Sequence, residues 1–152
     1  MTLVWAVLMG FLLAASAFFA MAETSFVGLS KLRLRHMVDR GIKQAKGLQQ
    51  LIARMDEVIT SIVLANNFVN TAISSLGAAL CIAWLGPEWG IPAATLIMGS
   101  AIILFGEITP KVFGLRHADR VALRVAPIVR VLILVLGPFS RRFTALSNTL
   151  LR

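Results

Sequence analysis

Long apolar stretches dominate this chain, and they constrain its fold more than any other feature. Residues 3–25, 58–85 and 92–110 are each apolar enough to cross a lipid bilayer as a helix, which takes about 20 residues. Hydrophobic residues make up 58% of the 152 residues, and the mean hydropathy is +0.84. A soluble domain of this length does not need so much apolar surface. The sequence therefore predicts a single-domain, all-α membrane protein with three transmembrane helices.

Basic residues are concentrated beside these apolar stretches. Residues 31–55 place Lys and Arg among regularly spaced apolar residues and are interrupted at Gly41, which predicts two short amphipathic helices on the membrane surface. Residues 115–150 are predicted to form further surface helices, because arginines recur at every fourth position from Arg116. A net charge of +8 that is arranged in this way suits an anionic membrane leaflet as the partner, and not nucleic acid.

The basic residues also predict the orientation. The segment after the first apolar stretch is strongly basic, whereas the expected turn at residues 86–92 has no Lys or Arg. The positive-inside rule then places the N-terminus outside and the C-terminus in the cytoplasm, in a multi-pass protein of the cell membrane. Residues 131–136 are too short to cross alone, so we expect a surface helix there, with a re-entrant segment as the alternative.

The first apolar stretch contains a possible signal-peptidase site at Ala15, Ser16 and Ala17. No Lys or Arg precedes it, so the basic region of a signal peptide is missing. We therefore expect a retained helix, in which small residues such as Ser16 and Ala20 allow neighbouring helices to approach closely.

A carboxylate stands near the end of the third apolar stretch. Gly106 and Pro110 flank Glu107 and are well suited to open a helix, because Pro110 cannot donate a hydrogen bond to the carbonyl of Gly106. An ionised group at membrane depth is costly, and freed carbonyl oxygens beside it resemble half of a cation site. The alternative is that Glu107 only ends the helix and pairs with Lys111.

The second apolar stretch contains a run of polar residues: Asn66, Asn67, Asn70, Thr71, Ser74 and Ser75. The spacing of Asn67, Asn70 and Ser74 (i, i+3, i+7) predicts that they share one helical face. Such residues either hold helices together or bind a ligand, and the sequence leaves both interpretations open. Glu23 is likewise either an interfacial helix end or a second acidic group at the site.

Amide, hydroxyl, carboxylate and carbonyl oxygens are the ligands of a hard cation such as Mg²⁺. The same neutral oxygens can also hold Na⁺, so ligand type alone does not fix the ion. The sequence has one cysteine and two histidines, and it shows no nucleophile–base pair and no phosphate-binding loop. We therefore expect no enzymatic activity.

Three stretches resemble, in order, the signature stretches of the transmembrane domain of the CorC/cyclin M (CNNM) magnesium transporter family. They are residues 18–24 (FFAMAET), 66–70 (NNFVN) and 105–111 (FGEITPK). The resemblance implies a homodimer of three-span subunits with basic juxtamembrane helices, which exports Mg²⁺ with coupling to Na⁺ entry in bacterial members. Relatives continue into cytoplasmic CBS domains, so this chain is expected to be the membrane part alone.

The resemblance also implies a ligand set. By position, the magnesium ligands fall on Asn67, Asn70, Ser75 and Glu107, with main-chain carbonyls near Met21 and Gly106. Ala20 stands where the family usually has serine, so an expected hydroxyl is missing and water or another oxygen has to replace it. Glu23 and Lys111 are expected at a cytoplasmic vestibule. The alternative function is a non-transporting membrane anchor that regulates other ion transporters.

Overall fold

The computed structural model describes the backbone of residues 2–150 and, within that range, the side chains of residues 4–139 and of Arg142. The elements are α1 (Thr2–Val27), α2 (Lys31–Asp39), α3 (Lys43–Ile52), α4 (Met55–Ala101), the π-helix η1 (Ile102–Ile108), α5 (Thr109–Arg116) and α6 (Ala118–Leu150). No strand occurs between residues 2 and 150, so the all-α prediction is confirmed.

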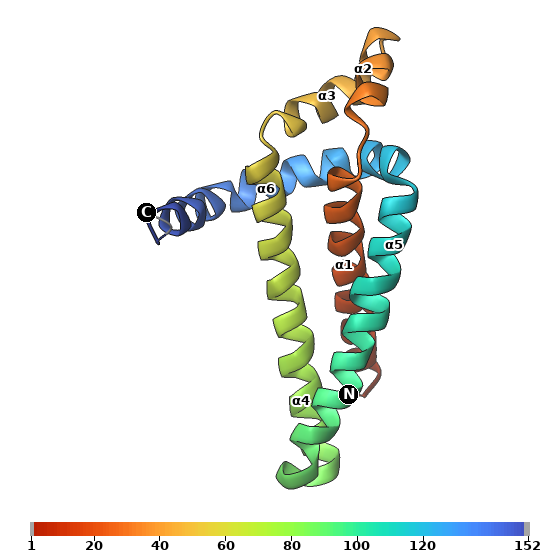
Figure 1. The fold of residues 1–152 in the computed structure, drawn as a ribbon. Helices are drawn as coiled ribbons and strands as arrows, with labels where there is room; N and C mark the ends of the chain where they lie inside the picture. Colours follow the sequence, from red (N-terminus) through yellow and green to blue (C-terminus); the bar gives the residue numbers. More distant parts are fainter. Residues whose placement is uncertain (1, 151–152) are drawn as a thin grey trace.

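Helix α4 folds back on itself. Gly86 has a φ of 78°, a conformation that only glycine adopts at little cost, and there the chain makes a hairpin at the lower end of Figure 1. The turn is shorter than the predicted turn at residues 86–92, because the helix resumes at Pro87. Proline fits this position, since the first residues of a helix have no use for their amide hydrogen.

The second arm of the hairpin continues through η1 into α5 and ends at Arg116, beyond the predicted end at residue 110. The helix widens near Pro110 instead of ending: the amide of Thr109 bonds to the carbonyl of Leu104, five residues earlier. A wider turn gives the proline ring room beside the preceding carbonyls. The backbone irregularity predicted around Gly106 is therefore present, as a π turn inside a continuous helix.

The basic juxtamembrane segment forms two short helices as predicted, α2 and α3, which are separated at Gly41 (φ 77°). Residues 118–150, for which several surface helices were expected, form the one helix α6. It runs crosswise to the long helices at the end where α2 and α3 lie (Figure 1). Along α6, Arg120 and Arg124 are exposed, whereas Val121 and Val125 are buried.

Three segments are long and apolar enough to cross a membrane: Val4–Val27, Met55–Arg116 and Ala118–Phe139. The first matches the predicted span at residues 3–25, and the second contains both of the other predicted spans. The break at Gly86 divides Met55–Arg116 into two arms that lie lengthwise beside α1, whereas Ala118–Phe139 lies crosswise to all three (Figure 1). The predicted spans therefore correspond to α1 and the two arms of the hairpin, in a multi-pass membrane protein.

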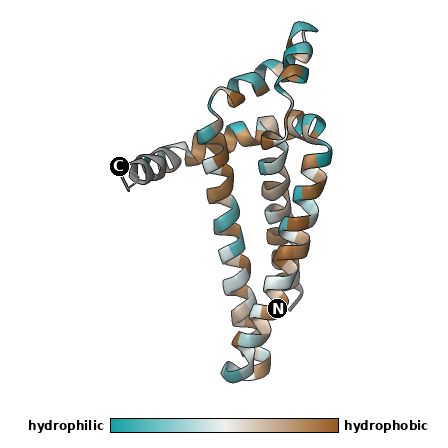
Figure 2. Cartoon of the chain, in the orientation of Figure 1, coloured by the Kyte–Doolittle hydropathy of each residue, from teal (hydrophilic) through white to brown (hydrophobic). Residues whose placement is uncertain are grey.

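The largest buried cluster lies where the long helices meet α2, α3 and α6. Phe26 of α1, Leu48 of α3, Ile62 of α4 and Val129 of α6 belong to it. Elsewhere large apolar side chains remain exposed, including Phe11, Trp84, Trp89 and Leu96. Figure 2 shows this difference, since apolar residues line α1, α4 and α5 and hydrophilic residues gather in α2 and α3. Exposed apolar helix faces and tryptophans near the hairpin are typical of contact with lipid.

Candidate functional site

Four polar side chains meet between α1, α4 and η1. The hydroxyl of Ser16 lies 2.6 Å from Oδ1 of Asn70 and 3.2 Å from Oδ1 of Asn66. Nδ2 of Asn70 donates a hydrogen bond of 3.1 Å to Oε1 of Glu107. Ser16 and Asn66 are buried, and Asn70 and Glu107 are partly buried. We call Ser16, Asn66, Asn70 and Glu107 the oxygen cluster.

Two amide oxygens of the oxygen cluster compete for one hydroxyl proton. Ser16 carries one hydroxyl proton, yet two amide oxygens lie within hydrogen-bond distance of it. The bond from Nδ2 of Asn70 to Glu107 turns the amide oxygen of Asn70 toward Ser16. An ionised carboxylate adds further acceptors and no donor. A cation among these oxygens would be coordinated by lone pairs that accept no hydrogen bond.

Gly106 lets α1 approach η1 at this point. A Cβ atom at position 106 would lie 2.8 Å from Oγ of Ser16, closer than an ordinary contact. Glu107 follows directly within the π-helix, and π turns occur frequently at functional sites. The predicted pair of Gly106 and Glu107 therefore lies at the oxygen cluster. The role of the Gly106 carbonyl as a ligand stays a prediction.

Asn67 and Ser75 do not join the oxygen cluster. Asn67 is exposed, and Ser75 is exposed in a separate groove of about 410 Å³ between the two arms of the hairpin. The residues that meet Ser16 are Asn66 and Asn70, spaced i and i+4, so the face chosen from the sequence was rotated by one residue. Metal binding by Asn67 and Ser75 remains a prediction that this geometry does not favour.

Ala20 and Met21 lie further along α1. Their carbonyls accept from the hydroxyl of Thr24 at 3.0 and 3.3 Å, and that of Met21 faces Gly114 of α5. Ala20 has no hydroxyl, but Ser16 stands four residues earlier on the same face of α1 and provides one. From the sequence, Ser16 was expected only to help helices pack closely. The four-residue spacing between Ser16 and Ala20 was the signal that could have identified Ser16 as a site residue.

Lys111 does not pair with Glu107. Its Nζ lies 3.6 Å from Oε2 of Glu23, while Glu107 accepts from Asn70. The interpretation of Glu107 as a helix end paired with Lys111 is therefore contradicted. Glu23 and Lys111 form an ion pair toward the end of α1 that leads to α2. Their function at a vestibule stays a prediction. Among the described residues, no group of three or more His, Cys, Asp and Glu side chains is placed to hold a metal.

Comparison with known proteins supports the resemblance. Residues 7–152 match the family described as "Cyclin M transmembrane N-terminal domain". The chain belongs to this family. It is 28% identical to the UPF0053 inner membrane protein YfjD of Escherichia coli over 90% of this chain. It is 36% identical to a chloroplastic DUF21 domain-containing protein of Arabidopsis thaliana over 93% of this chain. A polyamine export protein of Salmonella typhimurium is 26% identical, again over 93% of this chain.

These relatives are much longer than this cyclin M domain. The chain spans 32% of the Escherichia coli protein, 21% of the Arabidopsis protein and 34% of the Salmonella protein. The match over residues 7–152 shows the family.

Proposed function

We propose that this chain transports Mg²⁺ through the oxygen cluster, as the membrane domain of a homodimeric, sodium-coupled exporter. The observation that carries the proposal is the gathering of three neutral side-chain oxygens and one carboxylate between membrane-spanning helices, where two amide oxygens compete for one hydroxyl proton. Mg²⁺ prefers about six oxygens and keeps part of its water shell. Four side-chain oxygens leave positions for water or main-chain carbonyls.

The charge of the cluster suits transport. One carboxylate binds a dication less firmly than the several carboxylates of a storage site, so the ion can leave again. The π turn in η1 supplies a movable part, because a change from π to α spacing would rotate Glu107 relative to Asn70. Loss of their contact would release the ion to one side of the membrane, as alternating access requires.

The surroundings fit a cytoplasmic anionic leaflet at the end where α2, α3 and α6 lie, with the N-terminus on the opposite side. The homodimer, the coupling to Na⁺ and the direction of export are implied by the family resemblance. The relative named as a polyamine exporter suggests organic cations as a second candidate. The compact cluster with its single carboxylate fits one small ion better than an extended chain of ammonium groups.

Liposomes that contain the purified protein test the proposal. Glu107→Gln keeps the size of the side chain and removes the charge of the cluster. We expect Mg²⁺ affinity and Mg²⁺ flux to fall by about tenfold or more, because a charge-assisted contact contributes about 1.5–3 kcal/mol. Glu88→Gln is the matched control, because Glu88 is exposed beside the hairpin turn, away from the cluster, and its loss should leave both unchanged.

Three results would count against the proposal. If Glu107→Gln binds Mg²⁺ as tightly as the parent protein, the oxygen cluster is not the Mg²⁺ site. Flux of putrescine without flux of Mg²⁺ would favour polyamine transport. No flux of either in the folded parent protein would favour the membrane anchor that regulates other transporters.

A further inference from the structure

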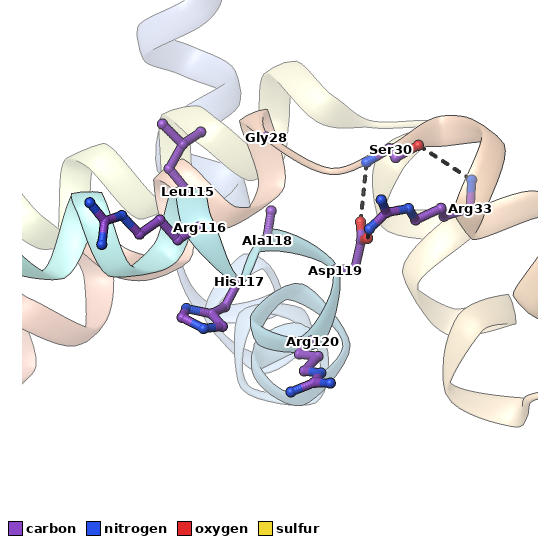
Figure 3. Close-up of a pocket in the computed structure, with 9 residues that line it drawn as sticks. All are labelled: Gly28, Ser30, Arg33, Leu115, Arg116, His117, Ala118, Asp119 and Arg120. Carbon is purple, nitrogen blue, oxygen red and sulfur yellow. Dashed lines mark hydrogen bonds and ion pairs between the residues drawn. The ribbon is translucent and has the colours of Figure 1, made fainter.

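A second site lies outside the oxygen cluster, at the corner where α1 meets α2 and α5 meets α6. It is a pocket of about 510 Å³ lined by Gly28, Ser30, Arg33 and residues 115–120. Figure 3 shows Arg33 and Asp119 facing each other at the right, Arg116 and His117 extending to the left, and Arg120 extending downward. The pocket thus joins two corners that are about 90 residues apart in the sequence.

The pocket has an excess of positive charge. It contains three arginines and one carboxylate, so the basic side chains outnumber the acidic one. Oδ2 of Asp119 accepts from Nη1 of Arg33 at 2.7 Å, and Oδ1 accepts from the amide of Ser30 at 3.3 Å. The one carboxylate is therefore already bound on both oxygens. Among the described side chains, Arg116 and Arg120 have no ion-pair partner.

The position of the pocket favours an anionic ligand that also has an apolar part. Gly28 follows the last residue of α1, so the pocket opens at the level where a spanning helix leaves the hydrocarbon. Leu115 lines the same pocket and is 60% exposed, which places an apolar surface next to the guanidinium of Arg116. A ligand with an anionic head and an apolar body matches this arrangement. A free phosphate ion would use only the arginines.

We propose that this pocket binds the headgroup phosphate of an anionic phospholipid. Arginine is suited to this ligand because its planar guanidinium donates two parallel hydrogen bonds to phosphate oxygens. Basic pockets between transmembrane helices on the cytoplasmic side bind headgroups in the same way. A bound headgroup would connect the α1–α2 corner with the α5–α6 corner and so fix the crosswise α6 against the spanning helices. The proposal does not depend on ion transport.

The test compares two variants that lose the same charge. The protein is placed in nanodiscs of phosphatidylcholine mixed with phosphatidylglycerol, and the lipids it retains are counted by native mass spectrometry. Arg116→Gln with Arg120→Gln removes the free arginines of the pocket. Arg35→Gln with Arg124→Gln is the control, because both residues are exposed and neither lines the pocket.

We expect the pocket pair to retain phosphatidylglycerol about tenfold more weakly and the control pair to change by less than about threefold, since only the first loses charge-assisted contacts. Asp119→Asn removes the anion that competes for Arg33 and should strengthen retention, which gives a second variant of opposite sign. Equal losses in the two pairs would show a diffuse attraction and overturn the site, as would weaker retention in Asp119→Asn. Displacement of the lipid by inorganic phosphate at equal concentration would assign the pocket to a soluble anion instead.

Discussion

The contact between Gly106 and Ser16 can be tested with a single methyl group. In Gly106→Ala the new Cβ would lie 2.8 Å from Oγ of Ser16, so either the hydroxyl or helix α1 has to move by several tenths of an ångström. Such overpacking costs about 1–3 kcal/mol. Alanine also favours a helix over glycine by about 1 kcal/mol, which offsets part of this cost.

Gly99→Ala supplies the reference. Gly99 lies in the same arm of the hairpin, and nothing stands within 4 Å of the position its Cβ would take. This variant should show the gain in helix preference without the clash. We therefore expect Gly106→Ala to be about 1–3 kcal/mol less stable than Gly99→Ala in equilibrium unfolding in detergent micelles.

Removal of the Ser16 hydroxyl should relieve the clash. Ser16→Ala alone leaves the oxygens of Asn66 and Asn70 without their donor and should cost about 1–3 kcal/mol. If the methyl group meets Oγ, the double variant is more stable than the sum of the two single changes predicts. The double variant should nevertheless bind Mg²⁺ more weakly than the parent protein, because it lacks the Ser16 oxygen of the cluster. Equal stability of Gly106→Ala and Gly99→Ala, or strict additivity in the double variant, would refute the close approach.

Two further predictions concern residues outside the cluster. Ser61 is fully buried and its hydroxyl has no hydrogen-bond partner, whereas the hydroxyl of buried Ser25 donates to the carbonyl of Ala22. Ser61→Ala should therefore leave the free energy of unfolding unchanged or raise it by about 1 kcal/mol. A loss of stability as large as that of Ser25→Ala would show that Ser61 has an unrecognised partner. Glu23 and Lys111 carry opposite charges at the expected vestibule. In liposome flux assays at low ionic strength, Glu23→Gln should therefore slow the entry of Mg²⁺ into the vestibule, and Lys111→Gln should accelerate it. Effects that persist at high ionic strength would contradict long-range attraction as their cause.

The sequence predicted the class of the fold well because hydrophobic length is a strong constraint. Residues 3–25 and 58–85 could hardly be placed except as spanning helices, and Gly41 separates two short helices as expected. The end of the third span was predicted less well, because a proline such as Pro110 often ends or kinks a helix. Here a π turn accommodates it, and the helix continues to Arg116. The sequence does not specify whether a helix ends at such a proline or continues through a π turn.

The candidate site was predicted in part. Glu107, Gly106 and Asn70 were named from the sequence and lie together, because an acidic residue between Gly and Pro at membrane depth has few structural explanations. Asn66 was left out of the chosen face because neighbouring helical residues differ by about 100° in direction, and only contact with α1 decides between Asn66 and Asn67.

Helix α1 packs along η1 and α5 with a regular spacing of contacts. Ser16 faces Gly106, and Thr24 faces Gly114, so a step of eight residues along α1 matches a step of eight along η1 and α5. The two helices therefore run in the same direction with a constant register, and small residues let them pack closely at both levels. The Glu23–Lys111 pair lies between these two contacts. A movement of α5 along α1 that separates Gly106 from Ser16 would therefore also shift Lys111 relative to Glu23.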